Sequence, residues 1–86
     1  MTTLYISIPA VAPEQRHALE DRLCAAVPGI ASVGGGTGMG ESDIDLATDL
    51  TDPDQVASKI VEVWKWLEAD GTRVLGVQAR IAHYDD

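Results

Sequence analysis

The 86-residue chain is poor in the features that secreted and membrane proteins require. Its single cysteine, Cys24, excludes an internal disulfide, which fits a reducing compartment. No stretch approaches the roughly 20 apolar residues that a membrane helix needs. The N-terminal residues Met1 to Leu4 have neither the basic nor the apolar region of a signal peptide. We therefore expect a soluble cytoplasmic protein without membrane attachment.

Basic residues are also scarce, because 6 lysines and arginines stand against 14 acids and give a net charge of -8. Such a charge repels phosphate backbones, so binding to nucleic acid is not expected. It attracts cationic partners and speeds encounter with them, although the same charge also serves solubility alone.

The sequence has no motif for a cofactor, a metal or a catalytic nucleophile. His17, His83 and Cys24 lack metal-ligand spacing. The five glycines between Gly34 and Gly40 have no G-x-G-x-x-G register, and an acidic segment follows them where a phosphate loop needs a helix. The acids that follow lack the calcium-loop pattern, and calcium takes about 6 to 8 oxygen ligands. We expect no catalytic, cofactor or metal site, and no enzymatic activity.

The hydrophobic pattern predicts one α+β domain over residues 1–86. Period-two alternation predicts strands, and apolar stripes at helical spacing predict helices. The glycine-rich segment 34–40 is predicted to be a hairpin connection, a bulged strand end or a mobile loop, with a flexible hairpin loop favoured. The predicted elements are strands at 4–8, 30–33, 41–50 and 74–81, and helices at 13–27 and 53–70.

This β-α-β-β-α-β order is that of ferredoxin-like folds. It predicts a four-stranded antiparallel sheet in the spatial order 4-1-3-2, with both helices on one face. In the last strand, Leu75, Ala79 and Ile81 should point inward together with Val77. The residues predicted to be buried are Leu4, Ile6, Ile44, Leu46, Trp64, Leu67 and Val77.

The opposite sheet face is predicted to be open and polar. Arg80 should lean toward Asp43 and Asp45 across Ser7, in a surface interaction worth about 0 to 1 kcal/mol. The residues expected on this face are Tyr5, Ser7, Asp43, Asp45, Gln78 and Arg80.

Trp66 lies about 80° from the apolar stripe of its helix at 100° per residue. We expect it to be partly exposed. Tryptophan is enriched at interface hot spots, but a large residue that covers the edge of a thin core is an equally good interpretation.

Several stretches are similar to small bacterial ferredoxin-like proteins, some of which resemble immunity proteins of contact-dependent or polymorphic toxin systems. The resemblance covers about residues 30–75 and implies a cytoplasmic inhibitor that binds one cognate toxin. It transfers no functional residue, since such interfaces differ from pair to pair. The residues that carry it are Gly34 to Gly38, Asp43 to Leu46, Asp52, Pro53, Ile60 and Leu67.

The leading hypothesis is a non-enzymatic binding protein that neutralises a basic toxin domain, a nuclease first of all, by covering it with an acidic surface. One alternative is a regulatory or ligand-sensing module that works as a homodimer through its sheet. Another is a small dimeric enzyme with a cleft between its subunits. The regulatory alternative rests on fold analogy. The residues predicted to bind the partner are Gly36, Thr37, Gly38, Glu41, Asp43, Asp45 and Trp66.

Overall fold

The computed structural model describes residues 1–81. Its elements alternate as the sequence predicts, in the order β-α-β-β-α-β. They are β1 (Thr2–Pro9), α1 (Pro13–Ala26), β2 (Ala31–Gly38), β3 (Glu41–Thr48), α2 (Pro53–Asp70) and β4 (Gly76–Ile81).

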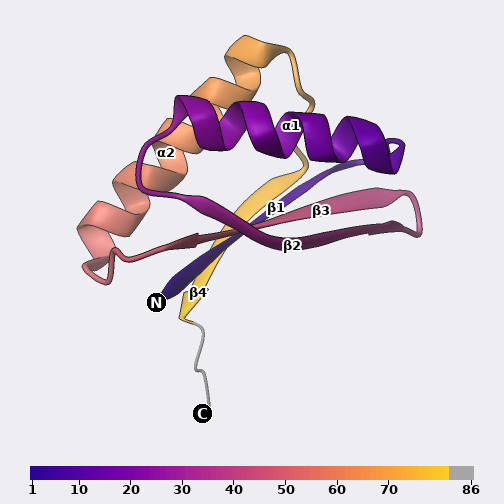
Figure 1. Cartoon of the computed structure of the whole chain (residues 1–86). Helices are drawn as coiled ribbons and strands as arrows, with labels where there is room; N and C mark the ends of the chain where they lie inside the picture. The colour runs from indigo at the N-terminus through magenta and orange to yellow at the C-terminus, as the bar shows by residue number, and fades with distance from the viewer. Residues whose placement is uncertain (82–86) are drawn as a thin grey trace.

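The four strands form one antiparallel sheet in the order β2-β3-β1-β4. Figure 1 shows α1 and α2 together on one face of this sheet. The prediction of a ferredoxin-like α+β fold is confirmed, and so is the predicted strand order. Within residues 1–81, no helix lies on the other face of the sheet, and β2 and β4 are the two edge strands.

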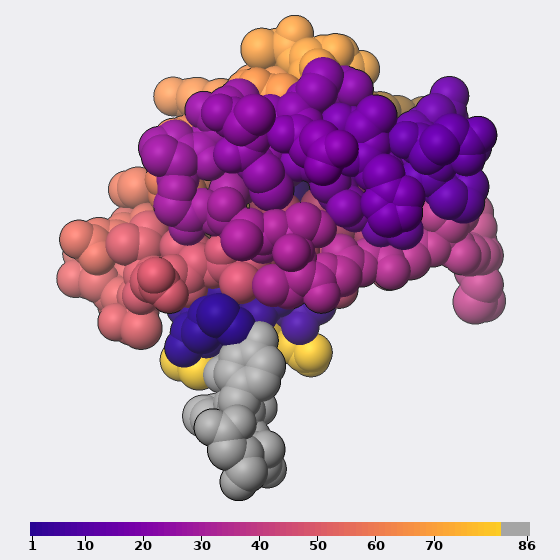
Figure 2. Space-filling model, viewed as in Figure 1, coloured from indigo at the N-terminus to yellow at the C-terminus, as the bar shows by residue number. Residues whose placement is uncertain are grey.

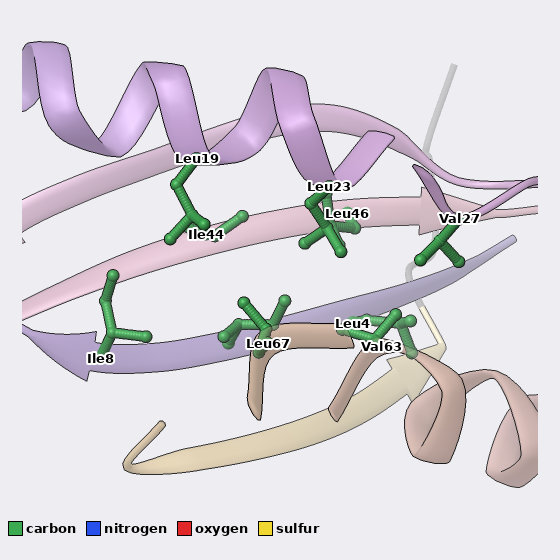
Figure 3. Packing of buried hydrophobic residues seen from close by; sticks show 10 residues of the cluster. Leu4, Ile8, Leu19, Leu23, Val27, Ile44, Leu46, Val63 and Leu67 are labelled. Atoms are coloured by element: carbon green, nitrogen blue, oxygen red, sulfur yellow. The ribbon is translucent and has the colours of Figure 1, made fainter. Parts of the chain in front are cut away.

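The core lies between the sheet and the two helices, as Figure 3 shows. Alternate residues of β1 and β3 point toward the helices, and Leu4, Ile6, Ile44 and Leu46 are fully buried. Leu67 of α2 packs against them. Period-two strands and one apolar stripe per helix thus produce a two-layer domain.

The helix ends follow local chemistry. Pro13 is the first residue of α1, where a missing N–H costs nothing. At α2, the side chain of Asp52 accepts a hydrogen bond from the N–H of Asp54 at 2.8 Å, as a capping residue does. Gly71 ends α2 with a φ of 84°, a left-handed conformation that glycine adopts without strain.

The glycine-rich segment is a strand, so the favoured prediction of a flexible hairpin loop is wrong. β2 runs to Gly38 and pairs with β3 along its length, with a bulge between Ser32 and Gly34. The alternative of a bulged strand fits. Local propensity disfavours strand here, but pairing with the regular strand β3 overrides it.

Trp64 is half-buried, so the prediction that it is buried is wrong. At 100° per residue, Trp64 and Trp66 flank the apolar stripe by about 80° on opposite sides. Trp66 packs against the core, whereas the indole N–H of Trp64 donates to Glu68 Oε1 at 2.7 Å. The two tryptophans therefore lie on opposite sides of the apolar stripe of α2.

The predicted inward set of β4 is only partly covered. Val77 is half-buried against the core, but Leu75 and Ile81 are 47% and 67% exposed and Ala79 is exposed. β4 is an edge strand, so the helix layer covers the sheet centre and leaves this margin open. These residues are less buried than predicted, because the alternation of apolar residues does not show where the helix layer ends.

Candidate functional site

The open face of the sheet carries a row of acids along β3. Ile44 and Leu46 point into the core, so the alternating side chains of Glu41, Asp43 and Asp45 point to the opposite face. We call these three residues the acidic row. The row lies on a central strand, between β1 and β2.

On one side, the acidic row faces polar residues of β1. Asp45 lies opposite Tyr5, and Asp43 lies opposite Ser7. The Ser7 hydroxyl donates to Glu41 Oε2 at 3.3 Å. A shallow hollow of about 400 Å³ opens over this part of the sheet, and its lining includes Tyr5, Ser7, Glu41, Asp43, Gln78 and Arg80.

Arg80 is the one cation that the structure places along this hollow, and Tyr5 holds it. Its Nε donates to the Tyr5 hydroxyl at 2.9 Å, and its guanidinium carbon lies 4.6 Å from the centre of the Tyr5 ring. Arg80 stacks on Tyr5 and does not lean across Ser7 as predicted, but its charge still lowers the pKa of Asp45. Within residues 1–81, no ion pair joins Arg80 to an acid.

The acidic row is poorly compensated. Burial raises the pKa of Asp45 above its usual 3.8, and the charges of Asp43 and Glu20 raise it further, against smaller opposing effects of Arg80 and Arg16. Within residues 1–81, the Oδ1 atom of Asp45 is buried without a hydrogen-bond partner. A cation placed at this row would favour the ionised form of Asp45.

On its other side, the acidic row faces glycines. Gly34 lies opposite Asp45, Gly36 opposite Asp43, and Gly38 opposite Glu41. A Cβ added at Gly36 or Gly38 would meet no atom within 4 Å, and one at Gly34 would meet only Asp45, at 3.4 Å. We call these three residues the glycine row. The structure thus brings Gly36, Gly38, Glu41 and Asp45 together with Asp43 on the open face, and the space above Gly36 and Gly38 is free.

Two predicted partner-binding residues lie elsewhere. Thr37 alternates with the glycine row and points to the helix side, where its hydroxyl lies 3.0 Å from the Ser42 hydroxyl. Trp66 lies on α2, in the layer on the other side of the sheet. A partner that contacts only the open face would therefore not meet the side chain of either residue.

The sequence prediction missed a buried ion pair beneath α1. Arg16 Nη1 and Glu20 Oε1 lie 2.6 Å apart, and their side chains are only 11% and 7% exposed. Ser32 of β2 donates to Glu20 Oε2 at 3.1 Å. The opposite charges at i and i+4 were a visible clue to pairing, but their burial depends on Gly35, which leaves room above the strand.

Other reactive groups do not gather at the acidic row. Burial raises the pKa of the Cys24 thiol, which disfavours the reactive thiolate. The described residues contain no group of three or more histidine, cysteine or acidic side chains that could hold a metal ion. His83 lies outside these residues. Neither helix of the described chain is long and apolar enough to cross a membrane.

No protein-family model and no curated protein matches the chain.

Proposed function

We propose that this is a cytoplasmic, non-enzymatic binding protein that neutralises a basic bacterial toxin domain by docking its acidic row against it. The observation that carries the proposal is the acidic row itself: three carboxylates on an open sheet face, bordered by glycines, with Arg80, the cation along the hollow, held by Tyr5. Lysine or arginine side chains of a partner would supply the missing positive charge.

The charge of the whole chain supports the same partner chemistry. A net charge of -8 steers cationic proteins toward the molecule and makes association fast and sensitive to salt. Toxins that cleave nucleic acid bind a polyanion and therefore carry basic clefts, so a nuclease domain is the leading partner. The resemblance to immunity proteins supports this choice.

Co-expression tests this function. Each reading frame that neighbours the gene is expressed in a host with and without the wild-type chain, and growth is measured. We expect growth only with the wild-type chain, and loss of protection when both Asp43 and Asp45 are changed to lysine. Equal protection by the charge-reversed chain would reject the acidic row as the site, and no protection by either would reject the function.

Exposed apolar side chains at β4 favour a second candidate, the regulatory homodimer. Leu75 and Ile81 are 47% and 67% exposed beside an edge strand, a position suited to strand pairing between two copies. Sedimentation at several concentrations tests it. A dimer that dissociates when Leu75 and Ile81 are changed to threonine would support this candidate, and a monomer at every concentration would reject it.

A further inference from the structure

The outer edge of β2 is unpaired, and beyond the bulge, from Gly34 to Gly38, it is also unprotected. No strand within residues 1–81 pairs with this edge, and Figure 2 shows the β2 segment at the surface below α1. From Gly34 to Gly38 the strand has no charge, no proline and no bulge. Natural proteins normally protect an edge with at least one of these, because its free backbone N–H and C=O groups invite another strand.

Beside this edge, the members of the glycine row and of the acidic row occur at every second position of their strands. Each glycine of the glycine row lies opposite one acid of the acidic row, all on the open face. Side chains of a strand added next to β2 would alternate in the same way. Every second side chain of the added strand would therefore lie on the open face beside a glycine of β2, and a carboxylate of β3 would follow on the far side of that glycine.

From this arrangement we propose that β2 accepts an extended segment of the basic partner as a fifth strand, with lysine or arginine at every second position. The segment's backbone pairs with the free edge between Gly34 and Gly38. Its basic side chains cross the glycine row and meet Asp45, Asp43 and Glu41 in turn. Backbone bonds supply affinity, and the alternating charges fix the register.

The distances permit this contact. Neighbouring strands lie about 4.8 Å apart, so an added strand would lie roughly 10 Å from β3. Lysine and arginine carry their charge on long aliphatic stems that can lie along a surface, and the carboxylates extend toward them from β3. Any side chain larger than hydrogen in the glycine row would stand in this path, whereas the space above Gly36 and Gly38 is free.

This inference rests on the proposed function and adds its recognition mode. A purely electrostatic contact needs only positive charge, whereas strand addition also needs extended backbone and alternating positions. The two can therefore be separated with peptides of identical charge.

The probe is a seven-residue peptide that alternates lysine and threonine. Its control has the same composition with the lysines in one block, and a third peptide is the alternating one with every backbone amide N-methylated. Binding to the full-length protein is measured by fluorescence anisotropy at low salt. We expect the alternating peptide to bind at least tenfold tighter than either control. Equal affinity for all three would overturn strand addition and leave the electrostatic function standing.

Two protein variants complete the test. Gly36→Val should weaken binding of the alternating peptide at least tenfold, because its side chain fills the path to Asp43 while charge and backbone stay the same. Ala31→Val adds similar bulk on the same face of β2, opposite Ala47 and beyond the bulge, and should bind as the wild type does. Thermal unfolding confirms that both variants fold. Unchanged binding by Gly36→Val would contradict the proposal.

Failure of the inference and failure of the function give different results. If the peptides do not discriminate but the charge-reversed chain loses protection in cells, only the strand-addition mode is wrong. If the charge-reversed chain still protects, the acidic row itself is wrong.

Discussion

The guanidinium group of Arg16 lies so close to Gly35 that a Cβ added at this position would clash with its Nη1 atom. Such a Cβ would also lie 2.6 Å from the carbonyl oxygen of Asp43 and 3.1 Å from Glu20 Oε1. Gly35 therefore lets α1 and its buried ion pair rest on β2. Gly36, its neighbour in the strand, faces the opposite side and meets no such obstacle.

The first prediction concerns these two glycines. Gly35→Ala should destabilise the protein by about 1 to 3 kcal/mol, because overpacking forces side chains or backbone to move. Gly36→Ala should be neutral or stabilising by up to about 1 kcal/mol, since alanine loses less backbone entropy. Urea unfolding of both variants measures the difference. Equal stability of the two variants would contradict the packing account.

The second prediction concerns the ion pair. Glu20→Ala should cost about 3 kcal/mol, because it leaves the charge of Arg16 buried without its partner. Glu62 pairs with Lys59 at 2.9 Å, but its side chain is 46% exposed, so Glu62→Ala is the matched control and should cost at most about 1 kcal/mol. The midpoints of urea unfolding are compared for the two variants. Equal midpoints would show that the buried pair contributes no more to stability than the surface pair does.

The sequence sufficed for those parts of the fold that depend on local periodicity. Leu4, Ile6, Ile44 and Leu46 alternate, and the structure buries all four. The same alternation placed Asp43 and Asp45 on the open face. Short connections and right-handed crossovers then left few arrangements of the strands.

The remaining features depend on tertiary contacts that no local pattern contains. Gly34 to Gly38 lack side chains that could indicate a strand, and only pairing with β3 makes them one. The exposure of Ile81 depends on where the helix layer ends. For Arg80, the decisive neighbour is Tyr5, which lies 75 positions away in the sequence.

The third prediction is a pH dependence that arises from Asp45. Burial and neighbouring acids raise its pKa in the folded state above the ordinary 3.8, so the folded state holds this proton more tightly than the unfolded state. Stability is therefore lost as the pH rises from 3.8 through the raised pKa. Asp45→Asn removes this loss and should unfold at higher urea concentration than the wild type at neutral pH.

The difference in stability between Asp45→Asn and the wild type should shrink as the pH falls through the raised pKa of Asp45, because the wild-type side chain then binds a proton in the fold as well. Urea unfolding of both proteins across this pH range measures the trend. A difference in stability that does not change with pH would show that ionisation of Asp45 is not its cause.

The most direct test of the central claim measures binding kinetics to the basic partner at two salt concentrations. The chain with Asp43 and Asp45 both changed to lysine is compared with one in which Asp21 and Asp49, two exposed acids away from the acidic row, are changed instead. Both variants have the same net charge, so a difference in binding between them reports the effect of the acidic row and not that of the overall charge. We predict slower association and weaker binding for the first variant, most clearly at low salt, and near wild-type affinity for the second. Equal binding by the two variants would contradict the account.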